Sequence, residues 1–193
     1  MNFPKVLSIR LCLLLLLMPA LALAASSYQH AEERSVPKAP QDVLKVLVAY
    51  DKTCDKGCAY KAPHVKETKR LAYKNGKTHW YTWQFVDHSL KSIKYFSEVS
   101  LQGDPTGSYQ LIVRQLNDSD KPLIATLEKK SGLRHAPSLD SVLTVTSVKA
   151  KASGSTVDIS TKIQASGMMT MFGSAIRSSM KKGVEATFNN LNK

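Results

Sequence analysis

The spacing of apolar side chains in the last part of the chain is typical of one long amphipathic helix. Phe172, Ile176, Met180, Val184 and Phe188 recur every four residues, and charged side chains fall outside this stripe. The pattern covers residues 168–191, which as a helix would extend about 36 Å, long enough to cross a whole sheet. We therefore expect this helix to pack its apolar stripe along β-strands.

A period of two replaces the helical period in the middle of the chain. Turn-forming residues separate segments in which apolar and polar side chains alternate, namely residues 69–73, 78–86, 93–101, 109–116, 142–151 and 156–164. Asn75-Gly76 lies between the first two segments, and this pair suits the positive φ angles of a tight type I′ hairpin turn. The pattern predicts an antiparallel sheet of about six strands.

Two short helices are expected beside these strands. Apolar residues within 43–48 follow helical spacing behind Asp42, although Val46-Leu47-Val48 would also fit a strand. Farther along, Asp120 and Pro122 mark a helix start, and Gly132 follows the basic last turn that ends it. The whole arrangement is of the α+β class.

The first residues of the chain have the pattern of an export signal. Lys5 and Arg10 precede an apolar run over residues 11–18, and Ala22-Leu23-Ala24 forms a small-x-small cleavage site. A membrane anchor is the alternative, but the run is shorter than the about 20 residues that span hydrocarbon. We expect residues 1–24 to be a signal peptide cut after Ala24, and the protein to be periplasmic or secreted.

The remainder of the chain is long enough for one hydrophobic core. Residues 25–41 are polar and contain two prolines, so we expect a flexible leader there and a single folded domain over residues 42–193. Hydrophobic residues make up 43% of the chain, which excludes a disordered protein.

The chain is strongly basic, with a formal net charge of +12. Without Lys5 and Arg10, the 27 basic residues fall to 25 against 15 acidic ones, a net charge of about +10. In an exported protein this excess favours an anionic membrane surface or an envelope polyanion over nucleic acid, and solubility alone remains an alternative. Basic residues concentrate in residues 61–77, which is where we expect such a membrane contact.

Cys54 and Cys58 are the two cysteines that follow the signal segment. Close pairs tend to oxidise in exported proteins, so we expect a local disulfide. The C-x3-C spacing disfavours a redox motif, and His64 is the one imidazole near enough for a zinc site. We expect neither a metal nor a cofactor.

The order of the predicted elements resembles the START-like, or Bet v 1-like (SRPBCC), helix-grip superfamily. The resemblance rests on that order, on Ser153-Gly154-Ser155 leading into Thr156-Val157-Asp158-Ile159, and on Gly167-Met168-Met169 before the final helix. It implies a curved antiparallel sheet that grips the C-terminal helix and leaves a cavity for lipids, sterols or polyketides. Cystatin-like folds also combine a sheet with a long helix and remain an alternative.

Aromatic and methionine side chains are the candidates for lining such a cavity. Met side chains repack around apolar guests, and Tyr and Trp combine an apolar body with a polar group. The same residues would also serve as ordinary core. The predicted ligand-binding residues are Tyr81, Trp83, Phe85, Tyr95, Met171, Phe172, Ile176 and Met180.

The sequence contains few signs of catalysis. Ser178 and Lys181 match S-x-x-K by their spacing, but they lie in the basic amphipathic helix, where the match is accidental. Asp87-His88, Arg134-His135 and Asp140 are ionisable groups that would lie near a pocket mouth if the fold brings them together. A periplasmic carrier of an apolar ligand is our first hypothesis, followed by an envelope protein-interaction module such as an inhibitor, and then by an enzyme.

Overall fold

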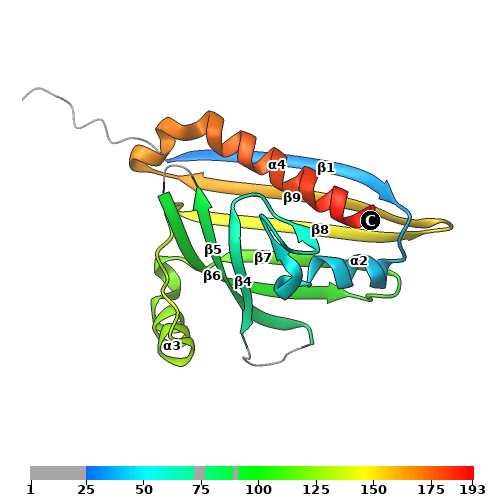
Figure 1. Cartoon of the computed structure of the whole chain (residues 1–193), viewed down its shortest axis with the longest axis horizontal. Helices are drawn as coiled ribbons and strands as arrows, with labels where there is room; N and C mark the ends of the chain where they lie inside the picture. Colours follow the sequence, from blue (N-terminus) through cyan, green and yellow to red (C-terminus); the bar gives the residue numbers. More distant parts are fainter. Residues whose placement is uncertain (1–24, 72–76, 89–90) are drawn as a thin grey trace, which may run out of the picture.

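One large antiparallel sheet organises the fold (Figure 1). The computed structural model describes residues 25–71, 77–88 and 91–193. Its seven strands lie in the order β1-β9-β8-β7-β6-β5-β4. They are β1 (Ser26–Val36), β4 (Val65–Leu71), β5 (His79–His88), β6 (Lys91–Gly103), β7 (Ser108–Gln115), β8 (Ser141–Lys151) and β9 (Gly154–Ala165).

Shorter elements surround this sheet. A small parallel pair joins β2 (Thr53–Cys54) to β3 (Tyr60–Lys61). The α-helices are α2 (Pro40–Leu47), α3 (Lys121–Ser131) and α4 (Gly173–Leu191), and the 3-10 turns are η1 (Tyr50–Lys52), η2 (Asp118–Asp120) and η3 (Gly167–Phe172). None of the helices in the described ranges is long and apolar enough to span a membrane.

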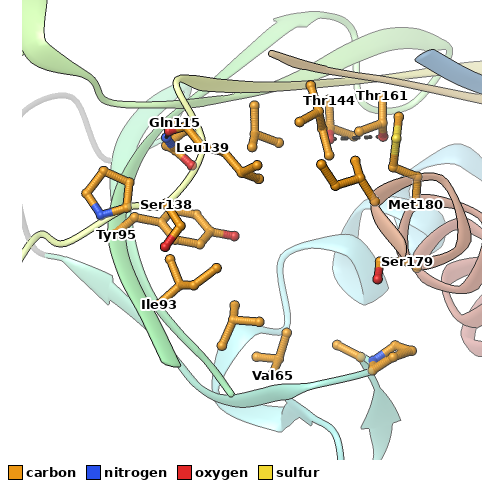
Figure 2. A pocket seen from close by; sticks show the side chains of 18 of the residues that line it. Val65, Ile93, Tyr95, Gln115, Ser138, Leu139, Thr144, Thr161, Ser179 and Met180 are labelled. Atoms are coloured by element: carbon orange, nitrogen blue, oxygen red, sulfur yellow. Dashed lines mark hydrogen bonds between the residues drawn. The ribbon is translucent and has the colours of Figure 1, made fainter. Parts of the chain in front are cut away.

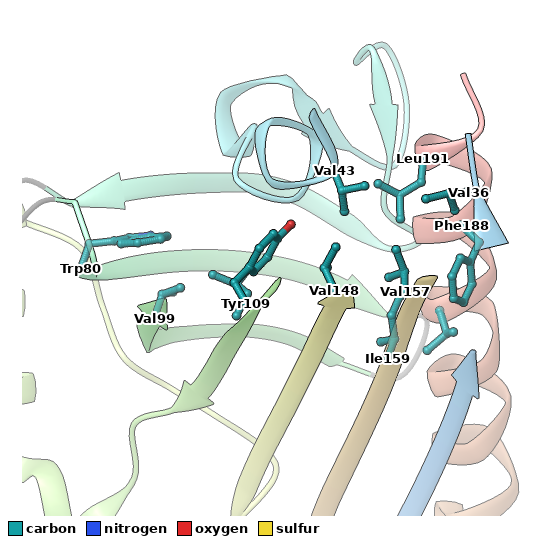
Figure 3. Close-up of a cluster of buried hydrophobic side chains, with 12 residues drawn as sticks. Val36, Val43, Trp80, Val99, Tyr109, Val148, Val157, Ile159, Phe188 and Leu191 are labelled. Atoms are coloured by element: carbon teal, nitrogen blue, oxygen red, sulfur yellow. The ribbon is translucent and has the colours of Figure 1, made fainter. Parts of the chain in front are cut away.

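The main hydrophobic core joins one end of α4 to the sheet and to α2. Phe188 and Leu191 of α4 are fully buried against Val36, Val157 and Val43 (Figure 3). These side chains come from four elements, β1, α2, β9 and α4, so their burial fixes α4 and α2 on the same side of the sheet.

The long C-terminal helix is confirmed, but its first turn is not α-helical. Residues 167–172 form the η3 turn, and α4 begins at Gly173. Gly167 adopts a left-handed φ of 56°, and a side-chain carbon at Gly173 would come within 2.9 Å of the Tyr28 hydroxyl. The chain therefore reaches the helix by a tight turn that packs onto β1.

The prediction of a flexible leader over residues 25–41 is wrong. Residues 26–36 form β1, which pairs with β9 from Ser26 opposite Ala165 to Val36 opposite Ser155. The sequence of this strand shows no alternation of apolar side chains, because part of its contact with α4 is made by the charged side chain of Arg34. Its guanidinium lies 4.8 Å from the centre of the Phe188 ring and donates to Glu185 Oε2 at 2.5 Å. The sheet consequently has one strand more than expected.

The other predicted elements are confirmed with small shifts at their ends. Residues 40–47 form a helix, which was one of the two alternatives for this segment. Gly132 ends α3, as expected, with a left-handed φ of 70°. β4 and β5 form the predicted hairpin, whereas its proposed Asn75-Gly76 turn lies outside the described residues. The signal segment, residues 1–24, lies outside them too and stays a prediction.

A second hydrophobic cluster covers the opposite face of β5 and β6. Leu127 of α3 packs there with Tyr81, Trp83 and Phe96. Trp83 also donates its indole N–H to the carbonyl oxygen of Arg134 at 2.9 Å. This part of the sheet therefore has apolar side chains on both faces, so the alternation alone does not show which face meets the cavity.

Candidate functional site

A large cavity lies between the sheet and the C-terminal helix (Figure 2). Its volume of about 1520 Å³ exceeds the range of about 300–1,000 Å³ that is usual for small-molecule pockets. Aliphatic side chains from β4, β5, β6, β8, β9, α2 and α4 form a large part of its wall. They are Val65, Val86, Ile93, Val142, Ile159, Ile163, Val46, Leu47, Ile176 and Val184.

Charged side chains stand at the rim of this cavity. Lys61, Asp118 and Asp140 belong to its lining, and all three are exposed to solvent. An unpaired charge inside an apolar wall would lose most of its hydration, so the interior is suited to uncharged chemical groups. The polar groups farther inside are hydroxyls, amides and one imidazole.

Tyr95 places a hydroxyl inside the cavity. It extends from β6, and Figure 2 shows its oxygen pointing toward the open centre. The hydroxyl donates to Gln84 Oε1 of the neighbouring strand at 2.5 Å. Burial raises the pKa of Tyr95 to about 12, so the group is neutral at physiological pH. With its proton engaged by Gln84, its oxygen remains able to accept a hydrogen bond.

The loop between α3 and β8 adds further polar groups to the same wall. Ser138 has a buried hydroxyl oxygen with no hydrogen-bond partner in the described part of the chain. Gln115 anchors this loop by donating its amide N–H to the Leu139 carbonyl oxygen at 3.0 Å. Buried polar atoms usually have partners, so the unpaired Ser138 hydroxyl marks a place where a ligand atom would be accommodated.

His135 lies in the same loop and lines the cavity in its neutral form. Its Nδ1 accepts a hydrogen bond from the backbone N–H of Phe96 at 3.0 Å, and its ring stacks on the Phe96 ring with centres 5.8 Å apart. Burial lowers the pKa of His135 against the opposing influence of Glu128, Asp118 and Asp120. Because Nδ1 accepts, the ring proton resides on Nε2.

A hydroxyl pair and a methionine face each other farther along the cavity. Thr144 of β8 and Thr161 of β9 are joined through their hydroxyl oxygens at 3.1 Å. Met180 lies close to them on α4 (Figure 2). This wall therefore offers a soft apolar surface beside two already paired hydroxyls.

Thr53 and residues 61–63, on either side of a disulfide-closed loop, form another part of the wall. The predicted disulfide between Cys54 and Cys58 is confirmed, with Cα atoms 5.5 Å apart. Asn190 of α4 ties the end of this loop to the helix, because it accepts from the Lys61 backbone N–H at 3.0 Å and donates to the Lys61 carbonyl at 2.8 Å. The loop and α4 are thus held together at one end of the cavity.

Half of the residues predicted to bind a ligand line this cavity. They are Tyr95, Phe172, Ile176 and Met180. Ile176 and Met180 belong to the inward stripe of α4 and Tyr95 to the inward face of β6, whereas Phe172 lies on the η3 turn at the exposed edge of the cavity. Their contact with a ligand stays a prediction.

The placement of the other four predicted residues in the cavity is wrong. Tyr81, Trp83 and Phe85 point to the opposite face of β5, where they pack near α3. The alternation itself was correct, but both faces of β5 are apolar, and the face with Val86 is the one that meets the cavity. Met171 is 74% exposed on η3.

Sequence reasoning missed Ser138 and assigned His135 and Asp140 only to the mouth of a pocket. All three lie in the irregular loop before β8, which carries no hydrophobic period from which to read an inward side. Neither Asp87 nor Arg134 lines the cavity. Within the described ranges, no three His, Cys, Asp or Glu side chains gather in a way that would hold a metal ion.

Comparisons with known proteins find similarity at the level of the fold. No family profile matches the chain, and no curated protein matches its sequence. A STAR-related lipid transfer protein from Xanthomonas axonopodis is similar over 86% of each chain, with 14% identity and a TM-score of 0.59.

Two further solved structures have the same architecture. The structure of Ara h 8.0201 has 14% identity, a TM-score of 0.53, and coverage of 86% of this chain and 96% of its own. The Zhui aromatase/cyclase from Streptomyces sp. R1128 has 14% identity, a TM-score of 0.51, and coverage of 87% and 92%. The cavity between the sheet and the C-terminal helix thus lies in a scaffold that is shared by proteins with different names and activities.

Proposed function

Because this chain has the helix-grip fold of START-like and Bet v 1-like proteins, we propose that it is an exported, periplasmic binding protein for a hydrophobic or lipid-like ligand. The observation that carries this proposal is a cavity of about 1520 Å³ in which the charged lining residues, among those that the structure describes, are exposed to solvent. An apolar ligand would gain about 25 cal/mol for each Å² of surface that it buries there.

The polar groups inside the cavity narrow the ligand class. Tyr95 and His135 are neutral, with pKa values moved by burial away from the charged form. They can accept and donate hydrogen bonds but cannot balance a buried charge. The enclosed part of the ligand is therefore uncharged and mainly apolar, with an oxygen function near Tyr95 and Ser138.

The names of the similar solved structures support a mainly apolar ligand. One of them is named a lipid transfer protein and another an aromatase/cyclase, and the first name is that of a protein with an apolar cargo. The alternative of an envelope protein-interaction module predicts a filled core, and the cavity favours the binding protein over it.

Extraction of the purified protein tests the proposal most directly. The chain is produced with its signal segment, residues 1–24, purified under mild conditions, and analysed by native mass spectrometry and by mass spectrometry of a solvent extract. We expect a neutral, mainly apolar compound bound in a one-to-one ratio. A protein that is consistently empty and shows no thermal shift with a panel of neutral lipids and sterols would contradict the proposal.

A pair of α4 variants localises the binding. Gly183 lines the cavity, and an added Cβ there would meet no atom within 4 Å apart from its chain neighbours and the backbone of its own helix. Gly183→Leu therefore fills cavity space without displacing neighbours, and we expect it to reduce ligand occupancy. Ser178→Leu is the matched control, because Ser178 is exposed on the outer side of the same helix. Equal occupancy in both variants would place the ligand elsewhere.

A further inference from the structure

Exposed apolar side chains gather on the η3 turn, next to the cavity. Met168 is 76% exposed, Met171 is 74% exposed and Phe172 is 36% exposed. In the described part of the chain, Leu143 is the one other large hydrophobic residue in this exposed class, at 36%. Isolated exposed hydrophobic residues are common, whereas three within five positions indicate a contact surface.

The η3 turn is held in place by hydrogen bonds within the turn and to β1. Tyr28 of β1 donates its hydroxyl to the Thr170 carbonyl at 3.3 Å, and the Thr170 hydroxyl donates to the Gly167 carbonyl at 2.8 Å. Met169 packs inward with the cluster that contains Ile176. The outward direction of Met168 and Met171 is therefore built into a fixed turn.

The charges around this turn have a simple arrangement. Residues 166–176 include no charged side chain. The next residue, Arg177, places its guanidinium 5.1 Å from the centre of the Tyr28 ring, and Lys181 and Lys182 follow as exposed residues. One acid lies close, since Ser166 donates its hydroxyl to Asp140 at 2.9 Å. An apolar tip beside a cationic helix flank fits the interface of a phospholipid bilayer.

The tip is also continuous with the cavity. Met168 and Phe172 are both exposed to solvent and part of the cavity lining. An apolar molecule that leaves the cavity past these side chains would meet bulk water unless another apolar phase covers them. A bilayer surface in contact with η3 would supply that phase.

We propose that the η3 turn is a membrane-docking surface, in which Met168, Met171 and Phe172 insert into the interface of a phospholipid bilayer while Arg177 meets lipid phosphates. This assignment differs from the contact expected over residues 61–77. There, Lys66 lies 3.6 Å from Asp87 and Lys69 lies 2.9 Å from Glu67, so part of the positive charge is already paired. Transfer of a ligand through this docking surface rests on the proposed function, whereas binding of the surface to a bilayer does not.

Vesicle binding tests this surface without any bound ligand. The chain beginning at Ala25 is sedimented with vesicles of equal parts phosphatidylcholine and phosphatidylglycerol. We expect Met168→Ser combined with Met171→Ser to weaken partitioning by at least about tenfold, because two apolar side chains no longer insert. Leu143→Ser is the control, since Leu143 is an apolar side chain that is 36% exposed, as Phe172 is, but lies on β8, and we expect it to bind like the wild type.

A tryptophan placed in the turn reports insertion directly. Trp80 and Trp83 are 2% and 4% exposed, so brominated lipids should quench them little. Met171→Trp should be quenched when such lipids are present in the vesicles, and Leu143→Trp should not. The same quenching in both variants would overturn the proposed orientation.

Two further outcomes would overturn the proposal. One is unchanged vesicle binding by the double methionine variant, and the other is a dimer of the wild type in lipid-free solution that the double variant abolishes. The second outcome would identify η3 as a contact between copies of this chain. A protein without an extractable ligand that still binds vesicles through η3 would contradict the proposed function and leave this surface intact.

Discussion

Tyr95 combines a neutral hydroxyl with a position deep inside an apolar wall. Its pKa of about 12 keeps the proton on the oxygen at neutral pH. The hydroxyl donates a hydrogen bond to Gln84 Oε1. A ligand hydroxyl that donates to this oxygen would therefore meet a fixed acceptor. Since no ionisation of Tyr95 occurs near neutrality, binding through it should not change between pH 6 and pH 9.

We expect Tyr95→Phe to weaken binding of a ligand that carries a hydroxyl by about three- to tenfold, the value of one hydrogen bond. A ligand analogue without the oxygen should bind both proteins equally. Tyr109→Phe is the control, because the Tyr109 hydroxyl donates to the Pro40 carbonyl at 3.1 Å away from the cavity. Isothermal titration of the three proteins with both ligands measures the effect, and an equal loss in both tyrosine variants would contradict it.

His135 should make the folded protein sensitive to mild acid. Its pKa in the folded state is lowered by burial, so below about pH 6.5 the unfolded chain binds a proton that the folded protein resists. The stabilising contribution is complete above that pH and is lost as the pH falls. We expect the free energy of unfolding, measured with urea, to decrease between pH 8 and pH 5.

The variant His135→Asn tests this assignment. Asparagine offers an oxygen to the Phe96 N–H but does not titrate, so the decrease from pH 8 to pH 5 should become smaller. Asp120, whose pKa is lowered by its hydrogen bonds with Arg114, loses its contribution at lower pH than this range. An identical decrease in wild type and variant would show that another group is responsible.

At the scale of single elements, β1 and β5 show what a hydrophobicity pattern leaves undetermined. The strand β1 meets α4 partly through Arg34 and Glu185, and such a polar contact has no apolar period. In β5 the period was visible on both faces, so the sequence could not say which face meets the cavity. That choice depends on α3, which covers Trp83 and its neighbours from the other side.

Two glycines of α4 should respond in opposite directions to the same substitution. Gly183 lies within the helix with no atom near its missing side chain, so Gly183→Ala should stabilise the protein by about 0.5–1 kcal/mol. Gly173 begins the helix against Tyr28, where a new carbon would come within 3.0 Å of the ring. We expect Gly173→Ala to destabilise by about 1–3 kcal/mol.

Thermal and urea unfolding of the two alanine variants measures this difference. Both substitutions add one methyl group to the same helix, so each serves as the control for the other. A stabilising effect of Gly173→Ala would mean that the η3 turn is free to move away from β1.

For the molecule as a whole, the order of elements was sufficient to identify the helix-grip architecture. The long apolar stripe of residues 168–191 and the alternating strands were both visible in the sequence. The size of the cavity was not, because it depends on where the loop of residues 133–140 lies, and β1 was missed because it looked like a leader. Both are set by tertiary contacts rather than by local preference.

Truncation tests whether β1 belongs to the folded unit. A chain that begins at Asp42 lacks the partner of β9 and loses the buried side chains of Tyr28 and Val36. We expect it to lose a cooperative thermal transition and near-ultraviolet circular dichroism, whereas the chain beginning at Ala25 keeps both. Similar transition midpoints in the two chains would contradict this view of β1.

The pairing of β1 with β9 has a consequence for the time course of folding. Ser26 lies opposite Ala165, so the strand made first finds its partner only after nearly all of the chain has been synthesised. Contacts between such distant segments slow folding, and an incomplete chain would present open strand edges to its neighbours. The pairing of β1 with β9 must therefore follow synthesis of residues up to 165, and until then the open edge of β1 exposes the nascent chain to aggregation.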